Sequence, residues 1–478
     1  MTLCALKLLL EPTQLGIQIL DGQSRICNWL HNHLLQQANE LKTACIKTNN
    51  KEGLKTVYSK RGLRNLIPKA KAEHPFLCVV HSSPLKNVGL RLSESIQRHQ
   101  KSKKTKRLVG WPKFKSWKEG WYSLLYDEPR KGFKVKEDNL IISLGMGKDK
   151  EERSLIIPIC EAHTLKSKQI KTLRIIKELD QYYAIFTLKK EVPKTKAIHK
   201  AIALDPNHKN LAYGVDNEGK AIEVTSPTWL KTYDKRIDEL KAKRDRCKKK
   251  SKKCIVLDDK GQPTGKEYYL PSKQWKKYDQ TLKRALRKRR DQTKTFMYTT
   301  AHVFYREYDC VAIGDYTPDG SGDTKQMRRA MNNRSLIGRF KEILSWVAMK
   351  SGKTFHEYDE KGTTRTCRHC TYSEPNGIDP SIRMWCCQEC EAVHHRDENA
   401  AINGLGKALQ DVLEKSGTLV PIVSCSDLVV KQRWAFCVSP SGVIMTLQGQ
   451  NGEKIHSTRK LNRRHDSLRS KSCSLDQL

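Results

Sequence analysis

Two Cys-x-x-Cys pairs, separated by sixteen residues, restrict the fold of this chain more than any other feature. The pairs are Cys367 with Cys370 and Cys387 with Cys390. Four thiolates complete the tetrahedral shell of Zn²⁺, and this spacing is typical of a zinc ribbon. Cys386 precedes Cys387, but only Cys387 has the correct spacing to Cys390. Because four thiolates leave no open position for water, we expect a structural Zn²⁺ and a catalytic site elsewhere.

The charge of the chain indicates a polyanionic partner. Its 478 residues include 90 Lys and Arg against 52 Asp and Glu, a formal net charge of +38. Such an excess repels itself unless phosphates neutralise it, so nucleic acid is the expected partner. An anionic membrane is the alternative, but no apolar run reaches about 18 residues and no signal peptide is apparent. We therefore expect no membrane association, and the other twelve cysteines are expected to be free thiols in a reducing compartment.

The first part of the chain predicts a helical domain followed by strands. Apolar residues recur at helical spacing in 26–41 and 85–100, with a polar, Lys-rich connection between them. From 106 to 192, short alternating runs predict an antiparallel barrel. Its first run interleaves aromatic residues with lysines, which suits stacking on bases beside phosphate contacts. The same aromatic residues would equally suit a barrel core: Trp111, Phe114, Trp117 and Trp121.

The second part predicts a sheet interrupted by a basic helical region. Residues 201–224 read as three strands, the first ending at Asp205, as in the opening hairpin of an RNase H-like sheet. A basic helical pair is expected in 229–308, followed by a buried central strand in 310–318. An amphipathic helix (335–352) and an alternating strand (353–360) precede the cysteines. A helix through Leu413 and a polar tail with a possible hairpin follow them.

Two aspartates have positions suited to phosphodiester cleavage. Asp205 ends a predicted strand, and Asp397 begins a predicted helix just after the cysteine cluster. Hard cations such as Mg²⁺ require oxygen ligands, and two of them about 4 Å apart can stabilise the attacking and leaving oxygens. Each aspartate alone is equally explained as a turn former.

Six segments resemble the TnpB nucleases of transposons and their eukaryotic and viral relatives, the Fanzor proteins, which are similar to the compact type V CRISPR effectors. The resemblance lies in residues 110–116, 181–188, 203–216, 310–316, 358–370 and 385–404. It covers about residues 1 to 410 in order, and the segment around Asp397 is its most specific part.

The resemblance implies an α+β multidomain fold. A wedge β-barrel with an inserted helical recognition domain would be followed by an RNase H-like (RuvC) α/β domain with an inserted four-Cys zinc ribbon. The implied divisions are 1–17 (first part of the wedge barrel), 18–104 (recognition), 105–195 (wedge), 196–365 (RuvC), 366–396 (zinc ribbon, contacting target nucleic acid), 397–412 (end of RuvC) and 413–478 (tail).

The resemblance also implies RNA-guided, Mg²⁺-dependent cleavage of DNA. The partners would be a transposon-encoded guide RNA (omega RNA) and double-stranded target DNA with a short adjacent motif, bound by a monomer in a ribonucleoprotein. Guide pairing would read the target, while the protein holds the heteroduplex. The host would decide the compartment: the nucleus in a eukaryotic or viral setting, with 248–253 and 459–464 resembling import signals, or the nucleoid in bacteria.

One position departs from the family pattern. The second carboxylate of the family is typically a Glu where this chain has Gly314. Fanzors and their closest bacterial relatives resemble this chain in placing the acid before the zinc ribbon, at Glu360. We therefore expect Asp205, Glu360 and Asp397 to bind Mg²⁺, with Glu360 on the same strand face as His356 and Tyr358. The alternatives are a nuclease-dead RNA-guided repressor and, with weaker support, a DNA transposase.

Overall fold

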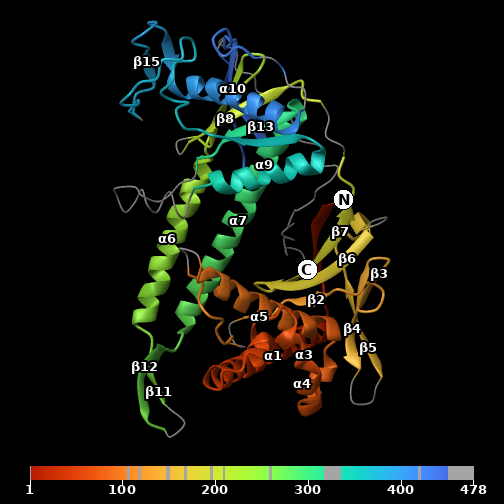
Figure 1. Ribbon diagram of the computed structural model, residues 1–478. Helices are drawn as coiled ribbons and strands as arrows, with labels where there is room; N and C mark the ends of the chain where they lie inside the picture. The colour runs from red at the N-terminus through yellow and green to blue at the C-terminus, as the bar shows by residue number, and fades with distance from the viewer. Residues whose placement is uncertain are drawn as a thin grey trace, which may run out of the picture. The chain divides into compact units, whose positions relative to one another are not determined.

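The chain folds into two compact units, one ending at Glu191 and the other beginning at Val192. The computed structural model describes residues 2–104, 108–116, 120–146, 151–165, 169–193, 197–207, 210–257, 261–316, 335–379, 381–417, 421 and 423–449. Figure 1 shows the elements of both units. Within the described residues, every helix is too short or too polar to cross a bilayer.

The first unit has two antiparallel sheets. The larger has the order β1-β7-β6-β2, and β3, β4 and β5 form the smaller. Their bounds are Thr2–Leu10 (β1), Leu124–Tyr126 (β2), Phe133–Lys136 (β3), Asn139–Met146 (β4), Glu152–Pro158 (β5), Gln169–Glu178 (β6) and Gln181–Lys190 (β7). An isolated bridge between Leu10 and Ile159 joins the sheets. The predicted single barrel from 106 to 192 is therefore two bridged sheets in the part of the chain described.

The helices of the first unit are inserted between strands of one sheet. After β1 the chain forms α1 (Gln14–Lys47), α2 (Lys51–Tyr58), α3 (Gly62–Asn65), α4 (Ile67–Glu73), the 3₁₀ helix η1 (Pro75–Val79) and α5 (Ser82–Ser102). The helices predicted at 26–41 and 85–100 are confirmed as parts of α1 and α5. The polar, Lys-rich connection between them, for which no elements were predicted, is mostly helical. These helices have only one or two turns, too few for apolar periodicity to stand out.

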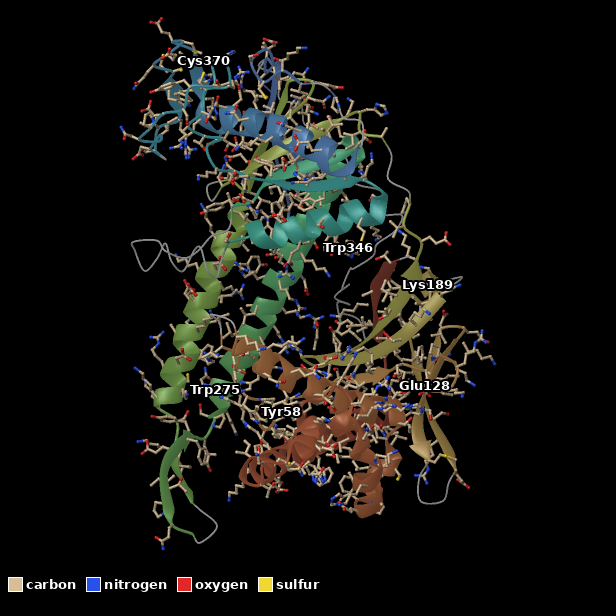
Figure 2. The ribbon with its side chains drawn as sticks, viewed as in Figure 1. Tyr58, Glu128, Lys189, Trp275, Trp346 and Cys370 are labelled. Carbon is tan, nitrogen blue, oxygen red and sulfur yellow. The ribbon has the colours of Figure 1, made fainter. Side chains whose placement is uncertain are left out.

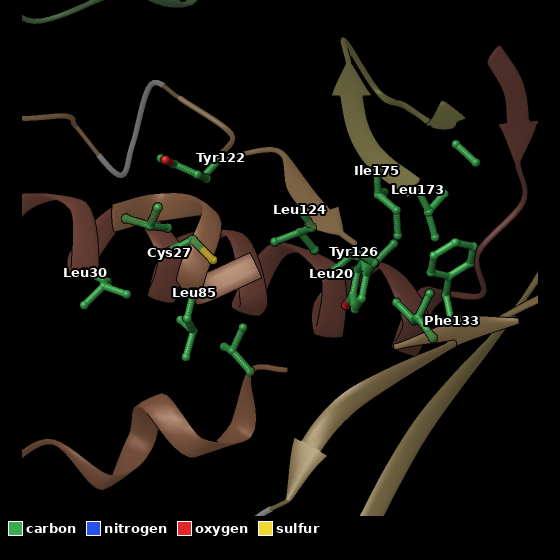
Figure 3. Packing of buried hydrophobic residues seen from close by; sticks show 14 of the residues in the cluster. Leu20, Cys27, Leu30, Leu85, Tyr122, Leu124, Tyr126, Phe133, Leu173 and Ile175 are labelled. Carbon is green, nitrogen blue, oxygen red and sulfur yellow. The ribbon is translucent and has the colours of Figure 1, made fainter. Parts of the chain in front are cut away.

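A single apolar core joins these helices to the sheets. Figure 3 shows part of it, where leucines of α1 and α5 pack against β2 and β6. The residues labelled there are Leu20, Cys27, Leu30, Leu85, Tyr122, Leu124, Tyr126, Phe133, Leu173 and Ile175. Fully burying one leucine stabilises a fold by roughly 1.5–3 kcal/mol, so this core holds the inserted helices to the strands.

The segment predicted as the first barrel strand has no strand structure in residues 108–116. Asparagine side chains on one face of α1 bind it instead. Asn32 Nδ2 donates to the Lys115 carbonyl (2.9 Å), Asn32 Oδ1 accepts from Lys115 N (2.8 Å), and Trp111 Nε1 donates to Asn39 Oδ1 (2.9 Å). Because the side-chain amide of Asn32 bonds both the N–H and the carbonyl of Lys115, the backbone there needs no strand partner. Trp117 lies outside the described residues.

The second unit is built on a seven-stranded mixed sheet with the order β14-β13-β8-β9-β10-β17-β18. Three strands pair antiparallel in sequence order, whereas β13 and β14 join parallel to β8. Their bounds are Ala201–Pro206 (β8), Ala212–Asp216 (β9), Lys220–Val224 (β10), Cys310–Gly314 (β13), Thr354–Tyr358 (β14), Gln432–Val438 (β17) and Ile444–Gly449 (β18). The predicted hairpin strands and buried central strand are confirmed. The hairpin of the tail joins this sheet through parallel pairing of β17 with β10.

Helices cover both faces of this sheet. On one face, α10 (Arg396–Ser416) packs leucines such as Leu405 on the alanines of β8 and β13. On the other face, α9 (Ile337–Ser351) and the end of α7 (Lys273–Glu307) pack on Leu204 and Ile313. The predicted basic helical pair is α6 (Thr228–Lys249) with α7. Figure 1 shows the two side by side, with a hairpin of β11 (Lys253–Leu257) and β12 (Pro263–Tyr269) at their far end.

The close approach of α10 to the sheet predicts that Gly404→Ala destabilises the second unit. A Cβ at Gly404 would lie 2.7 Å from Cε2 of Tyr358, whose ring is fully buried and cannot move aside. We expect a loss of about 1–3 kcal/mol, measured as a lower thermal midpoint. Gly338→Ala in α9 is the matched control, because a Cβ there meets nothing within 4 Å. An equal midpoint for both variants would contradict the proposed packing.

Candidate active site and metal-binding cluster

The four cysteines of the two Cys-x-x-Cys pairs lie together. Their sulfurs are all within 4.8 Å of one another, and Figure 2 labels Cys370 among them. Cys367 Sγ is 3.6 Å from Cys390 Sγ, and Cys370 Sγ is 3.6 Å from Cys387 Sγ. Four sulfurs at about 2.3 Å from one Zn²⁺ would be about 3.8 Å apart. The donor set and its spacing therefore fit a tetrahedral Zn²⁺ site.

The two Cys-x-x-Cys turns have the same backbone form. The residue after each pair, Thr371 or Glu391, has a left-handed φ of 63° or 59°. Each donates its N–H to the carbonyl of the first cysteine of its pair, Cys367 or Cys387, at 3.0 Å. This repeated turn aims both sulfurs of a pair at one point. Two independent copies of one turn are what a shared ion requires, because each supplies two ligands.

Cys386 lies outside the cluster. It is exposed, and its sulfur donates to the Glu391 carbonyl at 3.2 Å. It ends β15 (Met384–Cys386), which pairs with β16 (Val393–His395). β16 leads directly into α10, so the cysteine cluster is rigidly connected to the first turn of that helix.

Two asparagines of α10 hold the segment between Glu360 and the cluster, and the sequence analysis missed them. Asn399 Nδ2 and Asn403 Nδ2 both donate to the Thr366 carbonyl at 2.8 Å, and Asn403 Nδ2 also donates to the Thr363 carbonyl at 2.9 Å. Residues four apart lie on the same face of a helix. The four-residue spacing of these asparagines directly after Asp397 was the only sequence pattern that could have indicated their role.

Asp205, Glu360 and Asp397 are placed at one edge of the sheet by three different elements. Asp205 is near the end of β8, Glu360 follows β14, and Asp397 is in the first turn of α10. Asp205 and Asp397 are each only 7% exposed. Burial raises the pKa of Asp205 well above its ordinary value, and the nearby charges of Glu360 and Asp397 raise it further. The structure therefore places the three carboxylates singled out from the sequence near the same edge of the sheet, but their oxygens are not all within 4.8 Å of one another.

Glu360 occupies the space that a side chain at position 314 would fill. A Cβ built on Gly314 would be 3.1 Å from Cδ of Glu360 and 3.2 Å from its Cγ, and would overlap Oε2. Oε2 is buried and has no hydrogen-bond partner among the described residues. The missing Cβ at position 314 is thus what allows Glu360 to reach this edge of the sheet.

The prediction that Glu360 lies on the same strand face as His356 and Tyr358 was wrong. β14 ends at Tyr358, so Glu360 is not on the strand face shared by His356 and Tyr358. His356 Nε2 is 3.0 Å from Asp411 of α10, and Tyr358 packs against the same helix. A turn after the strand redirects the chain, and Glu360 N donates to Asp315 Oδ1 at 3.1 Å. Strand alternation does not continue through a turn.

Burial raises the pKa of Glu360 to about 7. A hydrogen bond from the Tyr316 backbone opposes this shift, the charge of Asp315 adds to it, and Lys341 and Arg396 offset part of it. Because Glu360 loses its proton only near neutral pH, the cations around it do not fully compensate its negative charge. A divalent cation would supply the missing positive charge.

A cationic side chain already contacts the third carboxylate. Arg383 Nη1 donates to both oxygens of Asp397, at 3.0 and 2.9 Å. Arg383 directly precedes β15 and therefore belongs to the cysteine-containing segment. The sequence offered no signal for this pairing, because Arg383 is one of many basic residues.

Comparisons with known proteins found a matching family model and solved structures of similar fold. Residues 338–404, which include the four cysteines, Glu360 and Asp397, match the family model of the Cas12f1-like TNB domain. The cryo-EM structure of a Cas12f1–sgRNA–target DNA complex is similar over 82% of this chain and 82% of that chain, with 12% identity and a TM-score of 0.53. At this identity the similarity establishes a shared fold.

Two further solved structures match less closely. A CRISPR–Cas12f ternary complex has 13% identity and a TM-score of 0.30, covering 80% of this chain and 81% of that chain. CasPhi-2 (Cas12j) bound to crRNA and phosphorothioate DNA has 12% identity and a TM-score of 0.34, covering 86% and 91%. These two scores are too low to support an argument. No curated protein sequence matches the chain.

The cysteine geometry predicts one zinc ion per chain. Cys387→Ser should lose it and lower the thermal midpoint, because the buried ligand set would be incomplete. Elemental analysis after dialysis measures the metal. Cys386→Ser is the matched control and should keep a full equivalent. Loss of zinc from the Cys386 variant instead would contradict the assignment.

The pKa of Glu360 predicts how the stability of the Mg²⁺-free protein depends on pH. Since the folded-state pKa of about 7 exceeds the ordinary value of 4.5, the stabilising proton is fully bound below about pH 4.5 and lost as pH rises through 7. Without added Mg²⁺ and with the zinc retained, the free energy of unfolding should fall across this range by at most about 3 kcal/mol. Glu360→Gln should flatten the fall, although Asp205 shifts in the same direction. Glu357→Gln, which pairs with Lys341 instead, should keep the wild-type profile.

Proposed function

We propose that this protein is an RNA-guided DNA endonuclease, with Asp205, Glu360 and Asp397 as its metal-binding carboxylates. The observation that carries the proposal is the position of Glu360: its carboxyl group lies against Gly314 at the edge of the sheet that also presents Asp205. If the chain had simply lost the family's Glu, burying another carboxylate beside Gly314 would cost free energy without any compensating function.

Three features of the carboxylates support a site for Mg²⁺. They supply hard oxygen ligands, Glu360 Oε2 lacks a partner among the described residues, and mutual repulsion raises the pKa of Asp205. Bound Mg²⁺ would activate water and stabilise the leaving oxygen of a phosphodiester. The protein's own contribution is to hold the three carboxylates together in a largely buried place where cations bind strongly.

The cysteine-containing segment would act as a brace in this proposal. Zn²⁺ would fix the two Cys-x-x-Cys turns, and these lead into α10 with Asp397 in its first turn. Asn399 and Asn403 hold the chain that runs from Glu360 to Cys367. Both flanks of the segment therefore end at carboxylates of one site.

The proposed partners are a transposon-encoded guide RNA and complementary double-stranded DNA with a short adjacent motif. The net charge of +38 supports a nucleic-acid partner, and the fold is shared with a Cas12f1 that was solved with sgRNA and target DNA. On this proposal the second unit is a RuvC domain with a TNB insertion. The first unit is a wedge domain carrying the recognition helices. The protein would act as a monomer in a ribonucleoprotein, located in the nucleus of a eukaryotic host.

One observation favours the second candidate, an RNA-guided DNA-binding repressor without cleavage. Arg383 already neutralises both oxygens of Asp397, and a metal ion must compete with it. If this pair persists in the complex, DNA would be bound and left intact. Titrating Mg²⁺ against the purified ribonucleoprotein separates the candidates, because only the endonuclease cuts at millimolar Mg²⁺.

The proposal predicts that Glu360→Ala abolishes cleavage and leaves binding intact. The protein is co-purified with its RNA and given Mg²⁺ and matching DNA. Cleavage should fall by about 10³-fold or more, because one of three metal-holding carboxylates is lost. Guide-dependent DNA binding should be unchanged. Glu357→Ala, three residues earlier and facing α9, is the control that should cut normally. Full-rate cleavage by the Glu360 variant would refute its role.

The contact between Gly314 and Glu360 predicts a rescue. Gly314→Glu combined with Glu360→Ala moves the carboxylate to the neighbouring strand, where the three atoms nearest to a new Cβ, all of them from Glu360, have been removed. We expect this double variant to cut at least about tenfold faster than Glu360→Ala, since a carboxylate returns near the same place. Gly314→Ala alone should slow cleavage by displacing Glu360. Normal cleavage by Gly314→Ala would contradict the close approach.

A further inference from the structure

The far end of the α6–α7 helical pair carries a pocket that the cleavage site does not use. It has a volume of about 260 Å³ and lies where α6 ends, β12 ends and α7 begins. Its walls include Arg244, Asp245, Lys248, Ser251, Tyr269 and Trp275. Figure 2 labels Trp275 at this end of the helical pair. α7 has 35 residues, so the pocket lies about 50 Å along this helix from the strand that carries Gly314.

The aromatic side chains of this pocket offer ring faces and unused polar groups. Tyr269 is 38% exposed, and Lys248 Nζ lies 5.6 Å from the centre of its ring. Within the described residues, the Trp275 indole N–H and the Tyr269 hydroxyl form no hydrogen bond. Residues that serve only to pack a tip would normally bury their rings. The exposed ring of Tyr269 beside the Lys248 cation, with the partly exposed ring of Trp275 in the same pocket, suits stacking on a planar base.

The surrounding charge suits phosphate. Residues 243–253 contain eight Lys and Arg and one acid. Lys248 pairs with no carboxylate in the described part of the chain, and Arg244 is shared between Asp245 (2.9 Å) and Asp279 (3.5 Å). The Lys-rich run at 248–253, which by sequence resembles a solvated face or an import signal, thus lies beside a pocket. Lysines around exposed rings are typical of single-strand binding surfaces.

The hairpin beside the pocket exposes further apolar side chains. Ile255, Tyr268 and Leu270 are 55%, 49% and 44% exposed. An apolar group of this kind at the end of a highly charged element indicates an interaction site. Its basic surroundings make nucleic acid the partner with complementary charge.

We propose that this pocket binds an unpaired nucleotide of an RNA. The base would stack on Trp275 or Tyr269, and its phosphate would contact Lys248. Asp245 favours a ribonucleotide, because its Oδ1 accepts both bonds from Arg244 and its Oδ2 can accept a hydrogen bond from a ribose 2′-hydroxyl. The inference rests on the proposed function, since the RNA supplied in the cell would be the guide. The binding chemistry does not depend on cleavage.

The test is site-specific photocrosslinking on the full chain. The probe is an unstructured RNA of about 16 nucleotides containing 4-thiouridine, compared with DNA of the same length containing 4-thiothymidine. Peptide mass spectrometry locates the crosslink. We expect RNA crosslinks in the peptides that carry Tyr269 or Trp275, and few from DNA. Trp275→Ala should reduce that crosslink about tenfold and Asp245→Asn should reduce the preference for RNA. Thermal midpoints near wild type show that both variants are folded.

A second tryptophan provides the matched control. Trp434 also has a lysine over its ring, with Lys220 Nζ 5.9 Å from the centre, but it lies on β17 outside the pocket. Trp434→Ala should leave the crosslink at the tip unchanged. Absence of RNA crosslinks at 269–275, or equal loss with Trp434→Ala, would overturn the inference. Stronger crosslinking of DNA would also overturn it. A wild-type chain that crosslinks RNA here and cuts no DNA would refute only the endonuclease.

Discussion

Electrostatic repulsion at Asp205, which is buried near the carboxylates of Glu360 and Asp397, is the interaction on which the second unit depends. Asp205, Glu360 and Asp397 come from a strand end, a turn and a helix start. The charges of Glu360 and Asp397 add to the cost of burying Asp205, and burial itself raises the pKa of Glu360. Proteins seldom gather such groups unless a cation compensates them. The rest of the unit can be understood as a frame that keeps them in place against this repulsion. The frame consists of the sheet edge, α10 and the cysteine cluster.

The frame is held from several directions. Asn399 and Asn403 fix the segment after Glu360, and Arg383 neutralises Asp397. The C-terminal hairpin contributes as well, because Arg433 of β17 contacts Glu398 beside Asp397 at 3.0 Å. The tail, whose purpose the sequence left open, therefore completes the sheet and anchors the first turn of α10.

Local patterns in the sequence predicted much of this and missed what depends on tertiary contact. The spacing of the cysteines, the buried run of β13 and the amphipathic pattern of α9 act over a few residues, so they could be read directly. The segment around Trp111 alternates like a strand, yet side chains of α1 bind it as an irregular segment. Glu360 was identified through a family resemblance, and its true route through a turn could not be read from alternation. The Arg383–Asp397 pair left no pattern at all.

The contact between Gly314 and Glu360 has a consequence for how such proteins change over time. The two positions compete for one volume, so a side chain at 314 and a carboxylate from 360 cannot both occupy it. A lineage that replaces a Glu at position 314 with one at position 360 must first lose the side chain at 314. Until the second Glu appears, its site has two carboxylates instead of three. If the three carboxylates cut DNA as proposed, ancestors on this path would bind nucleic acid before they regained the ability to cut it. Descendants that stopped there would persist as binding proteins.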